Sequence, residues 1–362
     1  MSRTIKSILT VALALSLVGV LLLGVAFGLG ARPEALVESV LSGSWNIVSL
    51  GFSSGYRDWD NVYSADGSYS VLAAGINSID LNWVAGNVRV SAGDGDEILF
   101  IEDSDEEIDK AKALRWGVKD GTLYIQYYAP GRYHGFSEKS LHMMIPRTLI
   151  SALKEFQFDA ASGSLIASGL SVGTARLNSI SGSIEYEGVF ETLRADSASG
   201  AMHIVSHGAS RSATVSSVSG RIHVSGDIEK LNIDSSSGDV ILDGALGKVS
   251  NFGEVEVSSI SGTVKLTGSI LSADIETSSG SVSVEAVNRP NDVDVDTVSG
   301  SVTFRLPADS GFSLRYDTVS GTLRSDFPAA QILGGETYTF GDGATKLHVS
   351  TASGGLQLAS LG

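Results

Sequence analysis

The chain has 362 residues, of which 42 are glycine, 6 are proline and none is cysteine. The lack of cysteine excludes a disulfide framework, a thiolate metal site and a cysteine nucleophile. A formal net charge of −16 argues against binding to nucleic acid or to anionic lipid, because both ligands are negatively charged. We interpret the acidity as a solvated surface on a strand-rich protein; a surface for divalent cations or polycations is the alternative.

An uncharged apolar stretch runs from Ile8 to Leu29. It is long enough to span a bilayer as a helix and longer than the apolar core of an ordinary signal peptide. Arg3 and Lys6 precede it, so the positive-inside rule places the N-terminus in the cytoplasm and the rest of the chain outside the cell. We predict a single-pass anchor in the cell membrane over residues 1–30; a cleaved signal peptide is the alternative.

The next part of the chain changes from mixed composition to short alternating runs. Residues 31–75 predict a juxtamembrane segment and linker, with ordered structure beginning near Ile76. Residues 76–150 alternate between apolar and polar positions, separated by Gly, Asp and Pro turn signals, which indicates an irregular β region. Within it, residues 105–116 suit either a short helix or a charged hairpin. We predict that this region caps the structure that follows, because open strand arrays expose unpaired backbone.

Ser-Gly pairs recur through residues 151–362, mostly 18 to 20 residues apart. Their glycines are Gly163, Gly182, Gly200, Gly220, Gly238, Gly262, Gly280, Gly300, Gly321 and Gly354. Apolar and polar residues alternate on both sides of each pair, which is strand geometry. One unit cannot bury its own apolar side chains, whereas stacked units can. The repeat predicts an all-β, single-domain parallel β-helix, or β-solenoid, of about ten Ser-Gly coils, and right-handed winding is preferred.

Each Ser-Gly pair is predicted to form a corner between two strands, because glycine adopts positive φ at no steric cost and serine can bond nearby backbone. A second glycine often follows six residues later and predicts the next corner, as at Gly169, Gly188, Gly226, Gly244 and Gly268. Aliphatic ladders would fill the core, flanked by a ladder of serine and threonine. The longer step before Gly354 leaves two readings open: the C-terminal stretch caps the solenoid, or its end is left for another chain.

These elements resemble the putative-adhesin family of β-strand-repeat proteins, a bacterial group of the domain-of-unknown-function 4097 type. The resemblance rests on residues 79–81, 86–90 and 120–125, on Ile145-Pro146 and on the Ser-x-Ser-Gly-x-Val coils. It covers most of residues 76–362. It implies a β-helix outside the membrane behind a single helix, with adhesion as a hypothesis, and it brings no catalytic motif.

Two groups of carboxylates are candidates for glycoside chemistry, because polysaccharide-active enzymes on β-helices carry acidic clusters on an outer groove. The groups are Asp234, Asp239 and Asp243 in one coil and Asp292, Asp294 and Asp296 in another. Their nearly alternate spacing favours solvated outer faces. Glycoside hydrolysis would require carboxylates to converge across coils.

Histidines and an acidic run are candidates for metal binding. His203 and His223 each follow a coil glycine by three residues, so we predict outward neighbours about 5 Å apart. With His207 they could hold a transition metal, although exposed histidines in register are the simpler interpretation. The run at residues 102–107 offers oxygen ligands for Ca²⁺, but it lacks EF-hand spacing, and a plain acidic loop is favoured.

Aromatic side chains gather before the repeat, at Tyr124, Tyr127, Tyr128, Tyr133 and Phe136. They suit a carbohydrate or protein contact, but packing in the core and cap is favoured. The coil serines, such as Ser219, are predicted to be structural, because ten equivalent serines do not make one nucleophile. The sequence contains no phosphate-loop or dinucleotide motif.

We therefore expect a non-enzymatic, membrane-anchored, extracellular β-solenoid that presents a rigid face to an envelope protein or carbohydrate, without metal or cofactor. An envelope-sensing partner of other membrane proteins is one alternative, and a polysaccharide-active enzyme is another. Self-association through the C-terminal coil would be a third way for such a solenoid to act.

Overall fold

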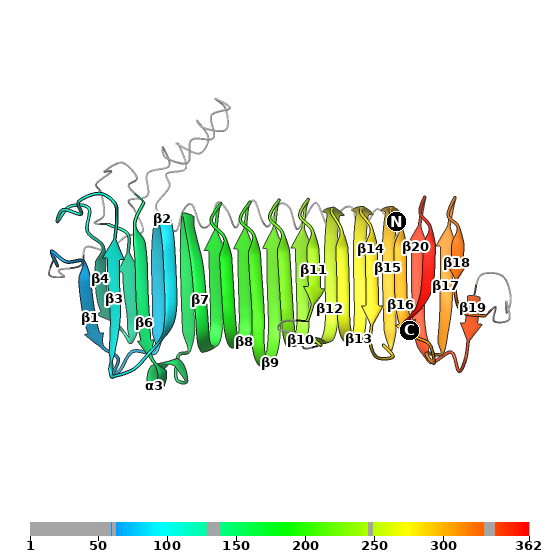
Figure 1. Ribbon diagram of the computed structural model, residues 1–362, viewed down its shortest axis with the longest axis horizontal. Helices are drawn as coiled ribbons and strands as arrows, with labels where there is room; N and C mark the ends of the chain where they lie inside the picture. The colour runs from blue at the N-terminus through cyan, green and yellow to red at the C-terminus, as the bar shows by residue number, and fades with distance from the viewer. Residues whose placement is uncertain (1–58, 60–62, 129–137, 245–248, 329–336, 362) are drawn as a thin grey trace, which may run out of the picture. The chain divides into compact units, whose positions relative to one another are not determined.

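The computed structural model describes residues 59, 63–128, 138–244, 249–328 and 337–361 (Figure 1). In these ranges the fold is all-β, apart from one helical turn, α3 (Arg147–Ile150). The described residues form two compact units, one ending at Met202 and one beginning at His203. A search of the same ranges finds no helix with the length and apolarity needed to cross a membrane. The predicted anchor lies outside the described residues.

The unit that ends at Met202 begins with hairpins and continues into parallel coils. Its strands are β1 (Ser68–Leu72), β2 (Ser78–Gly93), β3 (Glu97–Asp103), β4 (Arg115–Lys119), β5 (Thr122–Gln126), β6 (Ser140–Pro146), β7 (Glu155–Ser179) and β8 (Ile184–Ser197). β3 pairs antiparallel with β1 and β6, and β4 pairs antiparallel with β5. β2 pairs parallel with β5, β6 and β7, and β7 pairs parallel with β8. Irregular pairing therefore precedes regular stacking, as the sequence predicts.

Two local expectations for this unit differ from the structure. Ordered structure begins at β1, ahead of Ile76, because Tyr69 is buried and stacks on Phe100 with ring centroids 5.4 Å apart. Residues 105–114 form bends and turns, neither the short helix nor the charged hairpin that the sequence suggested. The Asp109 carboxylate accepts hydrogen bonds from the backbone N–H groups that follow it, which favours a turn at this point.

The unit that begins at His203 consists of stacked coils. Its strands are β9 (Met202–Ser217), β10 (Ile222–Ser235), β11 (Val240–Asp243), β12 (Asn251–Ser261), β13 (Val264–Ser279), β14 (Val282–Ala286), β15 (Asp292–Ser299), β16 (Val302–Pro307), β17 (Phe312–Thr318), β18 (Leu323–Ser325), β19 (Thr337–Phe340), β20 (Thr345–Thr351) and β21 (Leu356–Leu361). Each coil has a return arm, which follows one Ser-Gly turn, and an approach arm, which leads into the next.

Arms of the same kind pair in parallel from coil to coil, and this alignment builds the core. On the return arms, the buried side chains of Val224, Leu242, Leu266, Val284 and Phe304 stand in one register. On the approach arms, Ile233, Val257, Ile275 and Val295 do the same. The predicted aliphatic ladders are confirmed, and alternate residues face outward, as the period of a strand requires.

The Ser-Gly glycines are explained by close contact between coils more than by positive φ. All ten are described, and only Gly262 has a φ in the left-handed region, at 126°. A Cβ atom on Gly200 would lie 2.0 Å from the carbonyl oxygen of Gly182, and one on Gly280 would lie 2.0 Å from that of Gly262. A side chain at these corners would therefore push neighbouring coils apart. The expectation of positive φ is wrong for nine of the ten corners.

Three of the five glycines in the second set have the positive φ that glycine allows, whereas Gly188 does not. Gly169, Gly226 and Gly268 have φ angles of 71°, 110° and 153°. These glycines follow the return arms, at the corner of the coil opposite the Ser-Gly turn. Glycine adopts such angles without the steric cost that a Cβ atom brings.

The hydroxyl ladder beside the core fixes the Ser-Gly turn. The side chain of Ser179 accepts a hydrogen bond from the N–H of Gly182 at 2.9 Å, and Ser197 and Ser217 bond the glycine three residues ahead in the same way. The serine next to the glycine bonds between coils instead; Ser237 Oγ donates to the carbonyl of Val218 at 3.1 Å. Both kinds of serine are thus structural, as predicted.

The C-terminal coil lies inside the stack and not at its end. β20 pairs parallel with both β15 and β17, and β21 pairs parallel with both β16 and β18. The coil of β17 and β18 comes earlier in the sequence but lies beyond β20 and β21, and β19 pairs antiparallel with the far edge of β17. Figure 1 shows β20, in red, between the orange strands. Both edges of β20 and of β21 are already paired, so neither strand has a free edge through which the C-terminal coil could self-associate.

A buried ion pair joins several segments of the first unit. Lys139 Nζ lies 3.1 Å from Glu102 Oε2, and both side chains are almost fully buried. Glu102 also accepts hydrogen bonds from the Tyr69 hydroxyl and from the N–H of Leu114. Burial lowers the pKa of Lys139 to about 8, while the Glu102 carboxylate acts in the opposite direction. Glu102 is therefore a structural residue, and the run at residues 102–107 does not act as one acidic loop.

Candidate functional site

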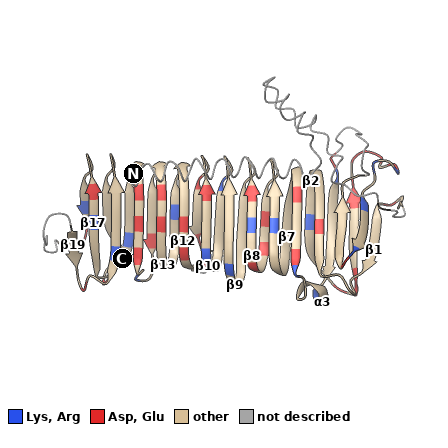
Figure 2. Cartoon of the chain, turned by 180° about the vertical axis from the view of Figure 1, so that it is seen from behind, with Lys and Arg blue, Asp and Glu red and all other residues tan. Residues whose placement is uncertain are grey.

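The outer face of the approach arms carries carboxylates in register on successive coils. Glu256 of β12 stands beside Asp274 of β13, and Asp274 stands beside Asp294 of β15. A second row, two residues earlier on each strand, contains Glu254 and Asp292. Figure 2 shows acidic segments gathered on the strands around β12 and β13. The repeat that aligns the core therefore also aligns negative charge.

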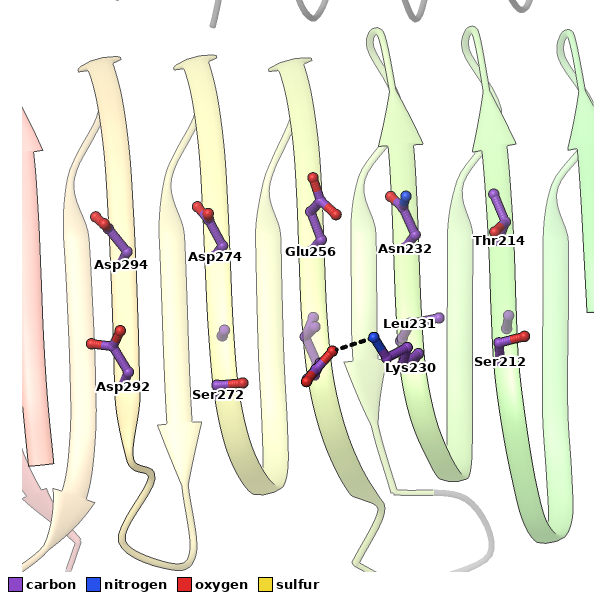
Figure 3. Close-up of a pocket in the computed structure, with 14 residues that line it drawn as sticks. Ser212, Thr214, Lys230, Leu231, Asn232, Glu256, Ser272, Asp274, Asp292 and Asp294 are labelled. Carbon is purple, nitrogen blue, oxygen red and sulfur yellow. Dashed lines mark ion pairs between the residues drawn. The ribbon is translucent and has the colours of Figure 1, made fainter. Parts of the chain in front are cut away.

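These rows line a hollow of about 600 Å³, which we call the acidic groove. It is lined by Ser212, Ala213, Thr214, Lys230, Leu231, Asn232, Glu254, Val255, Glu256, Ser272, Ala273, Asp274, Asp292 and Asp294. Small hydroxylated side chains on β9 and β13 leave the space between the longer ones. Figure 3 shows the outward side chains as two rows running across the strands, and its dashed line at Lys230 marks the ion pair with Glu254. That ion pair measures 2.8 Å, and the lining residues comprise five carboxylates and one lysine.

The crowding of like charges affects protonation in the groove. Partial desolvation is the main cause that raises the pKa of Asp274 to about 6, and the neighbouring carboxylates of Asp294, Glu276 and Glu256 contribute to the same rise. Near pH 6 this group therefore exchanges a proton, whereas an isolated aspartate would be fully ionised. The groove can hold a proton or attract a cation, because either reduces the repulsion between adjacent rows.

The groove ends at the C-terminal coil, where a histidine lies between two carboxylates. His348 of β20 stands beside Asp294 in register, with Nδ1 3.0 Å from Asp294 Oδ1. Its other ring nitrogen, Nε2, lies 3.2 Å from Asp317 Oδ2 on β17. Arg315 contacts the same Asp317 carboxylate at 2.8 Å. The carboxylates at this end are thus occupied, and the excess negative charge lies over β12, β13 and β15.

The structure separates the first group of carboxylates that the sequence suggested for glycoside chemistry. Asp234 lies on the approach arm of β10, whereas Asp239 and Asp243 lie with the return arm. Asp239 is 3.7 Å from Arg221 and accepts a hydrogen bond from the N–H of Thr263. The group therefore does not converge on one point.

The second group lies together on the outer face, as its alternate spacing predicts. Asp292, Asp294 and Asp296 alternate with buried residues along β15. Asp292 and Asp294 line the groove with Glu256 and Asp274, which the sequence reading missed. A signal was available, because Glu256, Asp274 and Asp294 all stand six residues before a coil glycine.

The histidine pair has the geometry predicted from its spacing. The rings of His203 and His223 stack with centroids 4.7 Å apart, and His223 Nε2 lies 2.7 Å from Asp243 Oδ1. His207 is exposed on the same strand as His203. Throughout the described ranges, no group of three or more histidine and carboxylate side chains could hold a metal ion. That search included the described acidic run at residues 102–107.

The aromatic cluster before the repeat belongs mainly to the core. Tyr127 and Tyr128 are buried, and Tyr127 packs edge-on against Trp83 with centroids 4.8 Å apart. Tyr124 stacks on Trp59 at 5.5 Å, over the position where Gly117 has no side chain. Tyr133 and Phe136 lie outside the described residues. For the described members, core and cap packing is the correct interpretation, and Ser219 falls among the structural turn serines.

Comparisons with known proteins identify the family. A family model described as Toastrack DUF4097 matches residues 75–243 and again residues 191–359. No curated protein matches the chain. The solved structures that match include a putative lipid binding protein from Parabacteroides distasonis, at 16% identity and a TM-score of 0.41, covering 82% of this chain and 96% of that one.

Two further matches carry adhesion in their descriptions. A putative adhesin from Bacteroides fragilis is 11% identical with a TM-score of 0.34, covering 80% of this chain and 95% of that one. A putative cell adhesion protein from Clostridium sporogenes is 10% identical with a TM-score of 0.19, covering 81% and 99%. The two family matches together span residues 75–359. The chain therefore belongs to the Toastrack DUF4097 family.

Proposed function

We propose that this chain is a non-enzymatic, adhesin-like binding protein of the cell envelope, anchored by residues 8–29 with its β-coils outside. In this proposal the acidic groove engages a cationic partner, such as a lysine- or arginine-rich protein segment. The observation that supports it is the groove itself, where five carboxylates and one lysine line a hollow of about 600 Å³.

Electrostatics favours a cationic partner over an anionic or neutral one. Carboxylates on adjacent parallel strands stand about 4.8 Å apart along the row and repel one another. A bound cation would relieve this repulsion and would lower the raised pKa of Asp274, so binding would release a proton. Such a surface also speeds the encounter with an oppositely charged partner, in a way that salt weakens.

A binding assay with the full chain in detergent tests the groove. The probe is a short oligolysine peptide, and the variant carries Glu256→Gln, Asp274→Asn and Asp294→Asn. We expect affinity to fall by about tenfold or more, and wild-type binding to weaken with salt and below pH 6.

The matched control removes the same charge from an exposed part of the first unit. It carries Asp103→Asn, Asp105→Asn and Glu107→Gln, three exposed carboxylates distant in sequence from the groove. Equal loss of affinity in both triple variants would mean that net charge alone attracts the peptide, and the groove proposal would fail.

The proposed location, with the β-coils outside the cell and residues 8–29 in the membrane, needs its own measurement. Protease treatment of intact cells should remove the β-coils and leave residues 1–30 with the membrane fraction. Full protection of the coils in intact cells, followed by digestion after lysis, would place them on the other side of the membrane and contradict the extracellular assignment.

A second candidate function is cleavage of an envelope polysaccharide, and one observation favours it. Asp274, with its raised pKa, stands beside the carboxylates of Glu256 and Asp294, and glycoside hydrolysis pairs a protonated carboxyl with an ionised one. Release of sugar fragments from purified cell wall, abolished by both Asp274→Asn and Asp294→Asn, would establish it. Equal background release by wild type and both variants would leave binding as the function.

A further inference from the structure

The inserted position of the C-terminal coil forces the chain to cross over itself. β19 lies on one side of β17 and β20 lies on the other, yet only residues 341–344 separate these two strands in sequence. The connecting turn therefore passes over the start of β17. Both of its glycines, Gly341 and Gly343, have left-handed φ angles, of 58° and 65°.

Gly311 is the residue over which the turn passes. A Cβ atom on Gly311 would lie within 2.6 Å of the backbone nitrogen of Asp342 and closer still to the Asp342 carboxylate. Just beyond the turn, the N–H of Thr345 donates to the carbonyl of Gly311 at 3.1 Å. Because the clash would be with backbone, a side chain here would displace the crossing itself.

The inserted segment consists of β20 and β21. It fits closely into the space between the coil of β15 and β16 and the coil of β17 and β18, which we call the slot. Leu347, Val349, Leu356 and Leu358 are each at most 2% exposed, and both strands of the segment are paired on both edges. On its outer face His348 contacts Asp294 on one side and Asp317 on the other. Every one of these contacts involves β15 to β18 and residues 345–361, and none requires that the two belong to one molecule.

We propose that the slot is an interaction site for a second copy of this chain, which inserts its own β20 and β21 between β15/β16 and β17/β18. Exchange in both directions gives a two-fold dimer in which the inserted coil makes the contacts seen here. The crossing over Gly311 is needed only when the segment folds back into its own slot, because a segment arriving from another copy does not have to pass from β19 across β17. A side chain at residue 311 therefore penalises the closed monomer and favours exchange. This inference does not depend on the proposed function of the groove.

The test uses disulfide trapping. Because the chain has no native cysteine, every disulfide must come from the introduced residues. Asp292 of β15 and Lys346 of β20 are exposed register partners, and neighbouring strands hold such pairs within disulfide reach. One full-length chain carries Asp292→Cys and a second, differently tagged chain carries Lys346→Cys. After the two are mixed and oxidised, a disulfide between chains forms only where one molecule's β20 lies beside the other's β15.

The proposal predicts how this signal responds to residue 311. Gly311→Ala in both chains should raise the disulfide-linked fraction several-fold, together with the dimer fraction by light scattering. Gly355→Ala is the matched control, because its Cβ would meet nothing closer than 3.5 Å, and it should change neither fraction. A Gly311→Ala protein that is folded, monomeric and unlinked would overturn the proposal.

A second arm covers the case in which Gly311→Ala does not fold. The two cysteine chains with native Gly311 are unfolded together and refolded at increasing protein concentration. The linked fraction should rise with concentration, because exchange is bimolecular, and a chain carrying both cysteines should form its disulfide internally at low concentration. An internal disulfide at every concentration, without linkage between chains, would also overturn the proposal.

Discussion

Replacement of Lys139 by methionine would break the buried ion pair of the first unit. The lysine ammonium donates to Glu102, to the carbonyl of Lys112 at 2.8 Å and to the carbonyl of Tyr127, and it lies over the Tyr127 ring at 4.2 Å. Methionine retains the aliphatic packing but removes every donor. The Glu102 carboxylate would then remain buried without its counter-charge.

The expected cost follows from this geometry. Removal of one partner from a buried ion pair typically lowers the free energy of unfolding by about 3–5 kcal/mol, because the remaining charge stays buried, without hydration and without a counter-charge. For a unit of this size, each kcal/mol lowers the melting temperature by about 3–5 °C, so the loss should be about 10–20 °C. Adding Glu102→Gln should recover most of it, since the Tyr69 hydroxyl and the Leu114 N–H can still donate to the amide oxygen.

Urea unfolding and calorimetry of the wild type, both single variants and the double variant would measure the coupling. Lys112→Met is the control, because its ion pair with Glu106 is exposed and 3.6 Å long and should contribute less than about 1 kcal/mol. If Lys139→Met cost no more than this control, or if the double variant lost the sum of both single losses, the ion pair would not hold the unit together.

Three other changes test the coil architecture and the groove. Gly200→Ala should cost at least about 2 kcal/mol in urea unfolding by forcing coils apart, whereas Gly355→Ala should cost under about 0.5 kcal/mol. Asp274→Asn should raise the free energy of unfolding by about 1 kcal/mol at pH 7, a value reduced for solvent screening of this partly exposed group. Near pH 4 the substitution should not change the free energy of unfolding. The folded pKa of Asp274 is raised to about 6, so its ionisation removes stability as pH rises from about 4 to 6; a stabilisation that does not vary with pH would contradict this. Ser197→Ala should lose about 1 kcal/mol with its turn hydrogen bond, whereas Thr297→Val should lose nothing, because the buried Thr297 hydroxyl has no hydrogen-bond partner among the described residues.

The fold was largely predictable because one period controls it. Residues at a fixed offset from each Ser-Gly pair stack on one another, and Val257, Ile275 and Val295 show this directly. The reason for the corner glycines was not predictable, since a sequence specifies which residue can adopt positive φ but not how closely two coils approach. Gly200 is required by the carbonyl of Gly182, which belongs to a different coil.

The order of the last coils and the burial of Glu102 could not be predicted from the sequence, because both depend on contacts between residues that are distant in the chain. β17 and β20 carry similar inward patterns, so local preference does not decide which one stacks on β15. The crossing that decides it depends on Gly311, which stands outside the ten regularly spaced Ser-Gly pairs. Glu102 begins a run of acids that suggests exposure, and its burial depends on Lys139, which is distant in sequence. The groove was partly predictable, because the charges of Asp294 and its neighbours follow the same register as the core.

The inserted coil also has a consequence for biosynthesis. The ribosome releases β17 and β18 before β20 and β21, yet the earlier pair cannot take its final place until the later pair has filled the gap beside β15 and β16. The growing solenoid can therefore add coils one after another as the chain emerges only as far as β16. Its last two coils must close together, and this step has to wait until β21 has been synthesised.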